Sequence, residues 1–253
     1  MEKIKCFGAI IGDVVGSVYE FNNYRRKDFP LISKRSVYTD DTILTLAVHQ
    51  VLEKNILDKE EIAKIYKEWT KKNPNCGYGC GYLQWVYSDD LKPYNSYGNG
   101  AAMRISPVAW FANTTEEVKY LSELVTSVTH NHPEGLKGAE VTAMCIFYAR
   151  IGKSKEFIKD YASKYYNLDF NYEDLKKNYW FNETCQDTVP QAIYCFLISN
   201  SFEDCLRTSV SIGGDTDTLC AISCAIAEAF YKDIDLNLLK KVINIVNKCN
   251  YVG

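Results

Sequence analysis

The chain has 253 residues, of which 47% are hydrophobic and 24% are charged, and its formal net charge is −3. A chain of this length can bury a core large enough to fold without disulfides. The hydrophobic and charged fractions are those of ordinary globular proteins, which argues against long disordered stretches. Acidic and basic residues are mixed along the chain, which argues against binding of a nucleic-acid backbone by charge alone.

Residues 1–6 do not have the pattern of a signal peptide, and no stretch reaches the ~20 apolar residues that cross a bilayer. The ten cysteines are therefore expected to be reduced thiols, mostly buried. Cys76 and Cys80 lack a second pair of ligands at zinc spacing, so a zinc site is not favoured there. We predict a cytoplasmic protein with no membrane partner.

The first predicted helix, about residues 6–19, carries three glycines at four-residue spacing, Gly8, Gly12 and Gly16. This spacing places all three on one face of a helix. Each costs about 1 kcal/mol relative to alanine in a helix interior, so the stripe indicates close packing against another helix. We expect that packing to bring the helix end, and Glu20 with it, against another element.

A pair of adjacent carboxylates, Asp40 and Asp41, follows Thr39 at the start of the next predicted helix, residues 41–53. Acidic residues and threonine are typical of a helix N-terminus, so capping is one interpretation. Adjacent carboxylates repel each other, however, and a bound cation would relieve that repulsion. Taken alone, the pair leaves both interpretations open.

The longest irregular segment, about residues 73–100, follows a helix predicted at 59–70 and ends in a glycine-containing loop. Loops of this length in compact domains are often functional. The loop leads straight into a helix, and backbone N–H groups at such a start suit a pyrophosphate, although an ordinary loop is the alternative. Its residues are Ser96, Tyr97, Gly98, Asn99 and Gly100.

Two of the three histidines, His130 and His132, lie in one short loop. Such a pair indicates either a binding site or hydrogen-bonded structural residues. The later segment from about 152 to 186 carries no motif with a recognisable role.

The strongest local signal is residues 213–218, Gly-Gly-Asp-Thr-Asp-Thr, ahead of a helix of small apolar residues. One Asp would satisfy a helix cap, whereas Asp215 and Asp217 with their flanking threonines exceed that need. Together with Asp40 and Asp41 they supply hard oxygen ligands, without sulfur or imidazole. That set suits Mg²⁺, Mn²⁺ or Ca²⁺, and four Asp can hold two ions ~3.5–4 Å apart.

Helical periodicity dominates the chain, and alternating strand patterns are nearly absent. We therefore predict an all-α fold in a single domain over residues 1–253. After the first helix, the periodicity places helices at 41–53, 59–70, 115–128, 135–151, 187–198, 202–212, 218–231 and 236–248.

These motifs together resemble the ADP-ribosylglycohydrolase family, which includes the hydrolase that reactivates dinitrogenase reductase and the vertebrate ADP-ribosylhydrolases. No single motif is decisive, but five in the family's order are specific. The resemblance rests on residues 8–21, 39–42, 96–100, 129–130 and 213–218.

The resemblance implies an orthogonal helical bundle with two Mg²⁺ or Mn²⁺ ions in a central cleft. It implies metal ligation by Thr39, Asp40, Asp41, Asp215, Asp217 and Thr218. Glu20 would contribute to catalysis, and a liganding Asp, Asp40 or Asp215, would accept a proton from water. The diphosphate and distal ribose would bind at Ser96, Tyr97, Gly98, Asn99 and Gly100, and His130 would contact ADP-ribose.

The expected reaction is hydrolysis of the N- or O-glycosidic bond between ADP-ribose and a modified acceptor, through an oxocarbenium-like transition state. Arginine, serine, a nucleobase and a small molecule all stay open as acceptors. Nucleic acid is expected as a partner only if it is itself the ADP-ribosylated acceptor. The choice between Mg²⁺ and Mn²⁺ and the oligomeric state also stay open. The alternatives are a hydrolase of small ADP-ribosyl or nucleotide-sugar compounds, and a non-catalytic ADP-ribose-binding relative.

Overall fold

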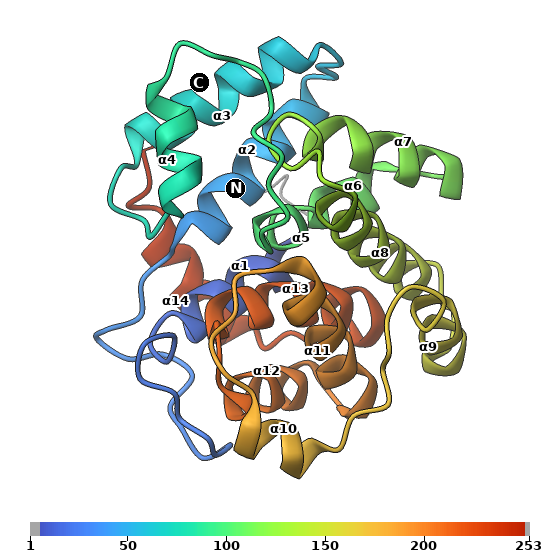
Figure 1. Ribbon diagram of the computed structural model, residues 1–253. Coiled ribbons are helices and arrows are strands. Elements are labelled where there is room, and N and C mark those ends of the chain that lie inside the picture. Colours follow the sequence, from blue (N-terminus) through green and yellow to red (C-terminus); the bar gives the residue numbers. More distant parts are fainter. Residues whose placement is uncertain (1–5, 251–253) are drawn as a thin grey trace.

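The computed structural model describes residues 6–250, and its regular structure is helical. Residues 1–5, on which most of the signal-peptide argument rests, lie outside the described part. Figure 1 shows the path of the chain. The helices are α1 (Phe7–Gly16), α2 (Asp40–Glu53), α3 (Lys59–Lys72), α4 (Cys80–Tyr87), α5 (Gly100–Met103), α6 (Ser106–Phe111), α7 (Thr115–Thr126), α8 (Pro133–Arg150), α9 (Lys155–Ala162), α10 (Tyr172–Asn178), α11 (Cys185–Ile198), α12 (Phe202–Ile212), α13 (Thr216–Tyr231) and α14 (Leu236–Val246).

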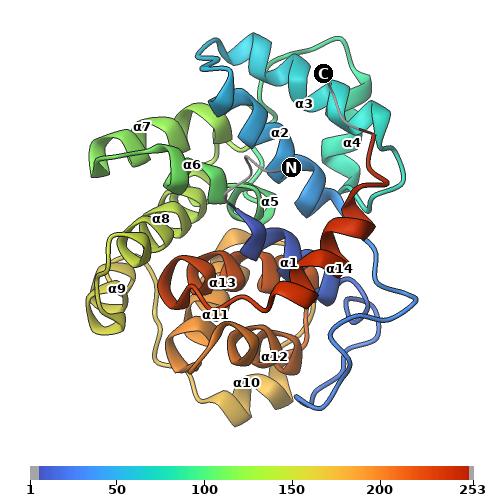
Figure 2. The same cartoon turned by 180° about the vertical axis from the view of Figure 1, so that it is seen from behind.

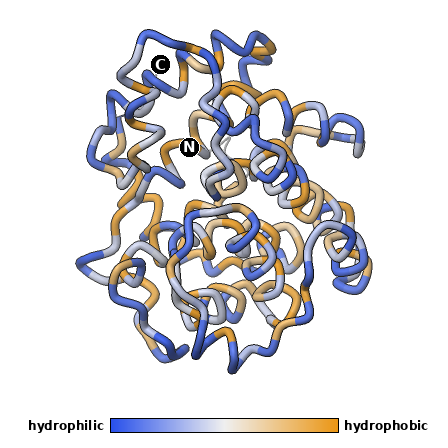
Figure 3. The backbone as a smooth tube through the Cα atoms, in the orientation of Figure 1, coloured by the Kyte–Doolittle hydropathy of each residue, from blue (hydrophilic) through white to orange (hydrophobic). Residues whose placement is uncertain are grey.

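The first and the thirteenth helix form the centre of the fold. α2, α3 and α4 lie on one side of this pair, α10, α11 and α12 lie on the other, and α6 to α9 flank it (Figure 1). Seen from behind, α14 runs beside α1 (Figure 2). Hydrophobic residues concentrate along the inner helices, whereas the peripheral turns are hydrophilic (Figure 3). Elements from the two ends of the sequence therefore share the core.

The glycine stripe of α1 packs directly on the backbone of α13. A Cβ on Gly8 would clash with the Cys224 carbonyl, and one on Gly12 would clash with the Cys220 carbonyl. Four residues further along α1, the contact lies four residues earlier in α13. The two helices are therefore antiparallel. The third glycine, Gly16, meets the first turn of α13. The end of α1 thus lies against the N-terminus of α13, as the stripe predicts.

Several parts of the secondary structure differ from the sequence-based expectation, and one of them is α6, which no predicted helix covers. The first helix ends at Gly16 rather than near residue 19, because the chain leaves the α13 contact there. α4 lies inside the segment predicted to be irregular, and its buried Trp85 anchors it to the core. α9 and α10 occupy part of 152–186. Short helices that begin near glycine-rich or polar stretches give weak periodic signals.

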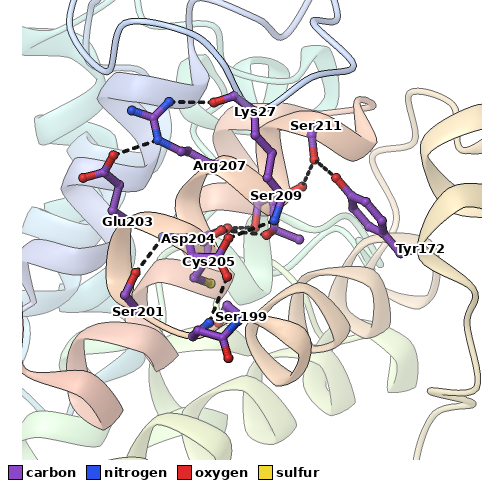
Figure 4. A network of polar contacts seen from close by, with 12 residues as sticks. Lys27, Tyr172, Ser199, Ser201, Glu203, Asp204, Cys205, Arg207, Ser209 and Ser211 are labelled. Atoms are coloured by element: carbon purple, nitrogen blue, oxygen red, sulfur yellow. Dashed lines mark hydrogen bonds and ion pairs between the residues drawn. The ribbon is translucent and has the colours of Figure 1, made fainter.

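The segment between α1 and α2 is held to α12 by polar contacts (Figure 4). The Lys27 ammonium lies 2.8 Å from an Asp204 carboxylate oxygen. The Arg207 guanidinium donates to the Lys27 and Phe29 carbonyls at 2.7 and 2.8 Å. These contacts fix a loop that has no helix or strand of its own.

Buried hydrophobic residues from α1 to α14 form one continuous core. This supports a single domain, which stays a prediction for the full range 1–253. Between residues 6 and 250, no helix combines the length and apolar character that crossing a membrane requires.

Candidate metal and substrate site

A buried aspartate of α1 organises the start of α2. Asp13 is fully buried and accepts hydrogen bonds from the Thr39 N–H and hydroxyl, both at 2.9 Å. It also accepts from the Thr42 N–H at 3.0 Å and from the Thr42 hydroxyl. These donors satisfy a carboxylate that burial would otherwise destabilise. Asp13 therefore holds the Thr39–Thr42 turn, with its two carboxylates, against the end of α1.

The two acidic segments meet across the helix pair. The Thr218 hydroxyl, in the first turn of α13, donates to Asp41 Oδ2 at 3.3 Å. The Thr39 hydroxyl lies 3.3 Å from the same oxygen. The N-termini of α2 and α13 therefore point at one another, each with aspartates in its first turn. The sequence-based prediction that these distant segments converge is confirmed as geometry.

Glu20 joins the acidic residues of α13. Carboxylate oxygens of Glu20, Asp215 and Asp217 all lie within 4.8 Å of one another. Asp215 occupies the N-cap position of α13, yet its side chain makes no capping hydrogen bond. It accepts instead from the amide of Asn99, at 2.7 Å. Capping therefore does not explain Asp215, and the packing of α1 on α13 explains how Glu20 reaches it.

Asp40 lies at the opening of the cluster and is only partly buried. Its N–H donates to the Cys76 carbonyl at 2.6 Å, which ties α2 to the segment before α4. Burial and then the nearby charge of Asp217 raise the pKa of Asp40 to about 8, and the charge of Arg104 offsets only part of this rise. Asp40 and Glu20 are thus the members of the cluster that are exposed enough to face a substrate.

Burial and mutual repulsion oppose ionisation of the whole cluster. The pKa of Glu20 rises to about 9, first because burial removes water and then because Asp217 and Asp40 are near. Burial raises the pKa of Asp215 to about 6. The pKa values of Asp41 and Asp217 are raised well above the usual range, again by burial first. Carboxylates in this arrangement require positive charge to ionise together.

The donor set fits divalent metal ions. Asp41 Oδ1 is buried and has no hydrogen-bond partner in the described part of the chain. Its neighbours offer carboxylate and hydroxyl oxygens, the ligands that Mg²⁺ and Mn²⁺ prefer. Each of the six predicted ligand residues lies in or beside the cluster. They are Thr39, Asp40, Asp41, Asp215, Asp217 and Thr218.

The 96–100 loop is held by the segment that precedes α11. Gly98 forms an isolated antiparallel bridge with Thr184, and the Asn99 N–H donates to the Glu183 carbonyl at 2.7 Å. The Cys185 N–H donates to the Tyr97 carbonyl at 3.0 Å. Part of the motif-free segment 152–186 therefore acts as the scaffold of the loop.

Two buried side chains support the loop from behind. His130 is buried, its Nδ1 lies 2.7 Å from the Thr129 hydroxyl, and a Cβ on Gly100 would be 3.3 Å from its Nε2. Burial, followed by the charge of Arg104, lowers the pKa of His130 well below its usual range, so the ring is neutral. Arg104 donates to the Gly100 carbonyl. The two residues leave little space for any side chain at position 100.

The outer part of the loop is open to solvent. Tyr97 is 47% exposed, and its ring centroid lies 5.2 Å from that of His132. Ser96 accepts a hydrogen bond from the Gly98 N–H at 3.1 Å. Loop and acidic cluster are joined through Asn99, which contacts both Glu183 and Asp215. The structure therefore brings all the predicted site residues into one connected region.

Sequence reasoning gave no role to Asp13, Arg104 or the Asn182–Thr184 segment. Asp13 had a signal, since it is the one charged residue in an otherwise apolar, glycine-lined helix. Arg104 could have been noticed as a charge directly after the small-residue run that follows Gly100. The Asn182–Thr184 contacts depend on tertiary pairing, which no local pattern reports.

Comparison with known proteins agrees with this geometry. The model of the ADP-ribosylglycohydrolase family matches residues 6–242. ADP-ribosylhydrolase ARH3 of Mus musculus is 27% identical over 88% of this chain and 82% of its own length. ADP-ribosyl-[dinitrogen reductase] glycohydrolase of Rhodospirillum rubrum is 27% identical over 93% and 87%. A solved ADP-ribosylglycohydrolase-related protein complex superposes with a TM-score of 0.72 at 21% identity, covering 94% of this chain and 93% of that one, which confirms the predicted fold.

Proposed function

This chain belongs to the ADP-ribosylglycohydrolase family, and we propose that it is a metal-dependent member that releases ADP-ribose from a modified acceptor. Its enzyme class is that of a glycosidase that hydrolyses ADP-ribose linkages. The metal requirement, the residue roles and the acceptor are the parts that we propose.

The observation that carries the metal proposal is the convergence of carboxylates from three separate segments. Glu20 follows α1, Asp40 and Asp41 open α2, and Asp215 and Asp217 open α13. None of them forms an ion pair with a Lys or Arg within residues 6–250. We infer that two Mg²⁺ or Mn²⁺ ions balance the charge, with Thr39, Asp40, Asp41, Asp215, Asp217 and Thr218 as ligands. Such ions would orient the distal ribose and lower the pKa of a nearby water molecule.

The substrate would lie between the acidic cluster and the 96–100 loop. Gly98 and Gly100 would let a diphosphate approach the backbone of the loop. Tyr97 and His132 would contact the adenine side of ADP-ribose, because the exposed ring of Tyr97 lies 5.2 Å from the half-buried ring of His132 at the outer part of the loop. Neutral His130, together with Ser96 and Asn99, would position the ligand. This orientation would place the anomeric carbon of the distal ribose over the cluster.

Glu20 and the aspartates would divide the acid–base work. A ligand aspartate, Asp40 or Asp215, would accept the proton of the attacking water. Glu20 would hold that water, transfer a proton or bind a ribose hydroxyl. The remaining carboxylate charge would stabilise an oxocarbenium-like transition state.

The decisive assay is a panel of substrates with a common ADP-ribose and different acceptors. Purified protein would be assayed with each substrate in Mg²⁺, in Mn²⁺ and in excess chelator, following release of ADP-ribose. We expect release from at least one modified acceptor, loss of activity with chelator, and recovery when metal is restored. Release that is indifferent to chelator would disprove the metal proposal. Turnover of small ADP-ribosyl compounds alone would indicate a hydrolase of small ADP-ribosyl or nucleotide-sugar compounds. Binding of ADP-ribose without turnover would indicate a non-catalytic relative.

We also propose that the reaction takes place in the cytoplasm. The cysteines all lie in the described part of the chain and are free thiols there. Thiols in this number persist in a reducing compartment. Fractionation of cells that express the chain, with an antibody against it, would test the location.

A further inference from the structure

The side-chain amide of Asn23 joins the segment after α1 to the turn before α13. Its Nδ2 donates to the Gly214 carbonyl at 3.0 Å, and its Oδ1 accepts from the Gly214 N–H at 2.8 Å. The same Nδ2 lies 3.0 Å from the Glu20 carbonyl oxygen and 2.9 Å from that of Tyr19. One half-buried side chain therefore contacts the backbone of Glu20 and of a turn that lies 191 positions further along the chain.

The backbone atoms that Asn23 contacts carry two members of the acidic cluster. Glu20 is contacted directly, and Gly214 immediately precedes Asp215. Carboxylate oxygens of Glu20 and Asp215 lie within 4.8 Å of one another. The amide of Asn23 thus connects the two backbone segments whose separation determines how close these carboxylates lie.

The turn and Asp215 are also held by groups other than Asn23. Arg25 donates to the Ile212 carbonyl at 2.7 Å, just before the turn. The Asp215 carboxylate accepts from the Asn99 amide at 2.7 Å. Loss of the Asn23 amide would therefore leave Asp215 with two supports that do not depend on it.

Glu20 has no comparable second support. α1 ends at Gly16, so Glu20 lies beyond its hydrogen-bonded turns. Within residues 6–250, Asn23 supplies the only hydrogen bond to the backbone of Glu20. Carboxylates at this spacing repel each other, so one that is not held at its backbone would move away from its neighbours. The contact with Asn23 therefore matters more for Glu20 than for Asp215.

We propose that Asn23 is a positioning residue that holds Glu20 at the acidic cluster by tying its backbone to the turn that presents Asp215. The inference rests on the proposed function, in which Glu20 contributes to catalysis. Asn23 acts through Glu20, because the hydrogen bonds of its side chain go to backbone groups. A displacement of about 1 Å in such a group can lower a rate about 100-fold.

The test compares two substitutions of Asn23 with one of its neighbour, on an ADP-ribosylated acceptor that the wild type turns over. We expect Asn23→Ala to lower kcat about 10- to 100-fold, with KM and ADP-ribose affinity by calorimetry within about twofold. Asn23→Asp keeps the size but places an oxygen beside three carbonyl oxygens, so its kcat should fall at least as far. Asn22→Ala is the matched control, since Asn22 is exposed and its side chain forms no hydrogen bond within the described residues.

A double-mutant cycle shows whether Asn23 acts through Glu20. In the Glu20→Gln background the position of residue 20 should no longer limit the chemical step. Asn23→Ala should therefore lower the remaining kcat by less than about twofold there, a departure from additivity that marks a shared role. A merely structural effect of Asn23→Ala would lower kcat by the same factor in both backgrounds.

Amide hydrogen exchange in excess chelator measures the tie without metal or turnover. The Gly214 N–H should be protected in the wild type and in Asn22→Ala. Asn23→Ala removes its acceptor and should speed exchange about tenfold, as for one lost hydrogen bond. Asn23→Asp keeps an acceptor oxygen and should keep the protection, although it loses kcat.

Several results would overturn the inference. They are wild-type kcat in Asn23→Ala, an equal loss in Asn22→Ala, a loss carried by KM, and an equal loss in the Glu20→Gln background. If the wild type releases ADP-ribose from no acceptor, the proposed function fails. The tie between Glu20 and the Asp215 turn is then decided by exchange alone. Protection of Gly214 that Asn23→Ala removes supports it, and rapid exchange of Gly214 in the wild type disproves it.

Discussion

The Thr218 hydroxyl lies 3.3 Å from Asp41 Oδ2, although 177 positions separate the two residues. This contact joins the first turns of α2 and α13, and with them the two pairs of aspartates. Neither helix could hold ions alone, because each contributes only part of an oxygen ligand set.

Replacement of Asp217 by alanine should abolish turnover with little loss of fold. The change removes a proposed ligand and also one of the charges that raise the pKa of Asp41 and Asp40. In chelator, the free energy of unfolding should therefore be unchanged or higher than in the wild type. Activity and denaturant unfolding would be measured in parallel. Near-normal turnover at saturating Mn²⁺ would show that Asp217 only stabilises the N-terminus of α13 and is not a metal ligand.

The stability of the metal-free protein should fall as pH rises. The pKa values of Glu20, Asp40 and Asp215 are raised to about 9, 8 and 6. Each lies above the value in an unfolded chain, so between about pH 4 and 9 the folded state binds more protons. The contribution of these three carboxyl groups to the free energy of unfolding is fully present below about pH 4. It is lost as pH rises through their raised pKa values.

Mg²⁺ or Mn²⁺ should oppose this loss, since ions bind the ionised ligands. The increase in Tm on adding metal should therefore grow between pH 5 and pH 8. Thermal unfolding with metal or with chelator at three pH values would measure it. An increase that is the same at every pH would contradict the link between ionisation and metal.

Asp13→Asn should weaken metal binding although Asp13 is not one of the proposed metal ligands. Asp13 accepts from two threonines with both carboxylate oxygens. An amide would turn an N–H₂ group toward those donors, which costs on the order of 1–3 kcal/mol for the unsatisfied groups. We expect a Mn²⁺ affinity at least tenfold lower by calorimetry and a lower free energy of unfolding. Wild-type affinity would show that the Thr39–Thr42 turn holds its shape without Asp13.

Gly100→Val should impair ADP-ribose binding and spare the metals. A Cβ there would lie 2.6 Å from Arg104 Nη2 and 3.3 Å from His130 Nε2. The loop would have to move away from both residues. Gly79→Ala is the matched control, since a Cβ at that position meets nothing within 4 Å. Calorimetry with ADP-ribose and with Mn²⁺ would separate the two effects, and unchanged ADP-ribose affinity would exclude the loop from the site.

Glu20→Gln should lower turnover about 100-fold or more while ADP-ribose still binds. Glutamine keeps the shape of the side chain and removes its charge and basicity, as in lost general acid–base catalysis. The variant should bind Mn²⁺ at least as a single ion, because the aspartates remain. Normal hydrolysis by this variant would show that the aspartates and the metals suffice.

Much of the site could be predicted because it is built from contiguous motifs at helix ends. Asp215 and Asp217 with their flanking threonines exceed what a helix cap needs, and this local excess is visible in the sequence. Asp40 and Asp41 alone left capping and metal binding both open. Glu183 could not be assigned, since its role comes from a tertiary contact with the 96–100 loop, and the sequence position of Arg104 marks it as notable without showing that it donates to Gly100. α4 was missed because its eight residues are too few to show a helical period clearly. The Asn23–Gly214 contact joins loops that no periodicity describes.

The pairing of α1 with α13 also determines when the protein can begin to act. Gly12 and Cys220 meet backbone to backbone, but the second is synthesised long after the first. At about 5–20 residues per second, the ribosome needs roughly 10–40 s to make the chain between them. Until that interval is nearly over, the nascent chain displays a bare glycine face and lacks Asp215 and Asp217, two of the five carboxylates of the acidic cluster. A chain that is released before Asp217 is made would therefore be inert, because its acidic cluster would be incomplete.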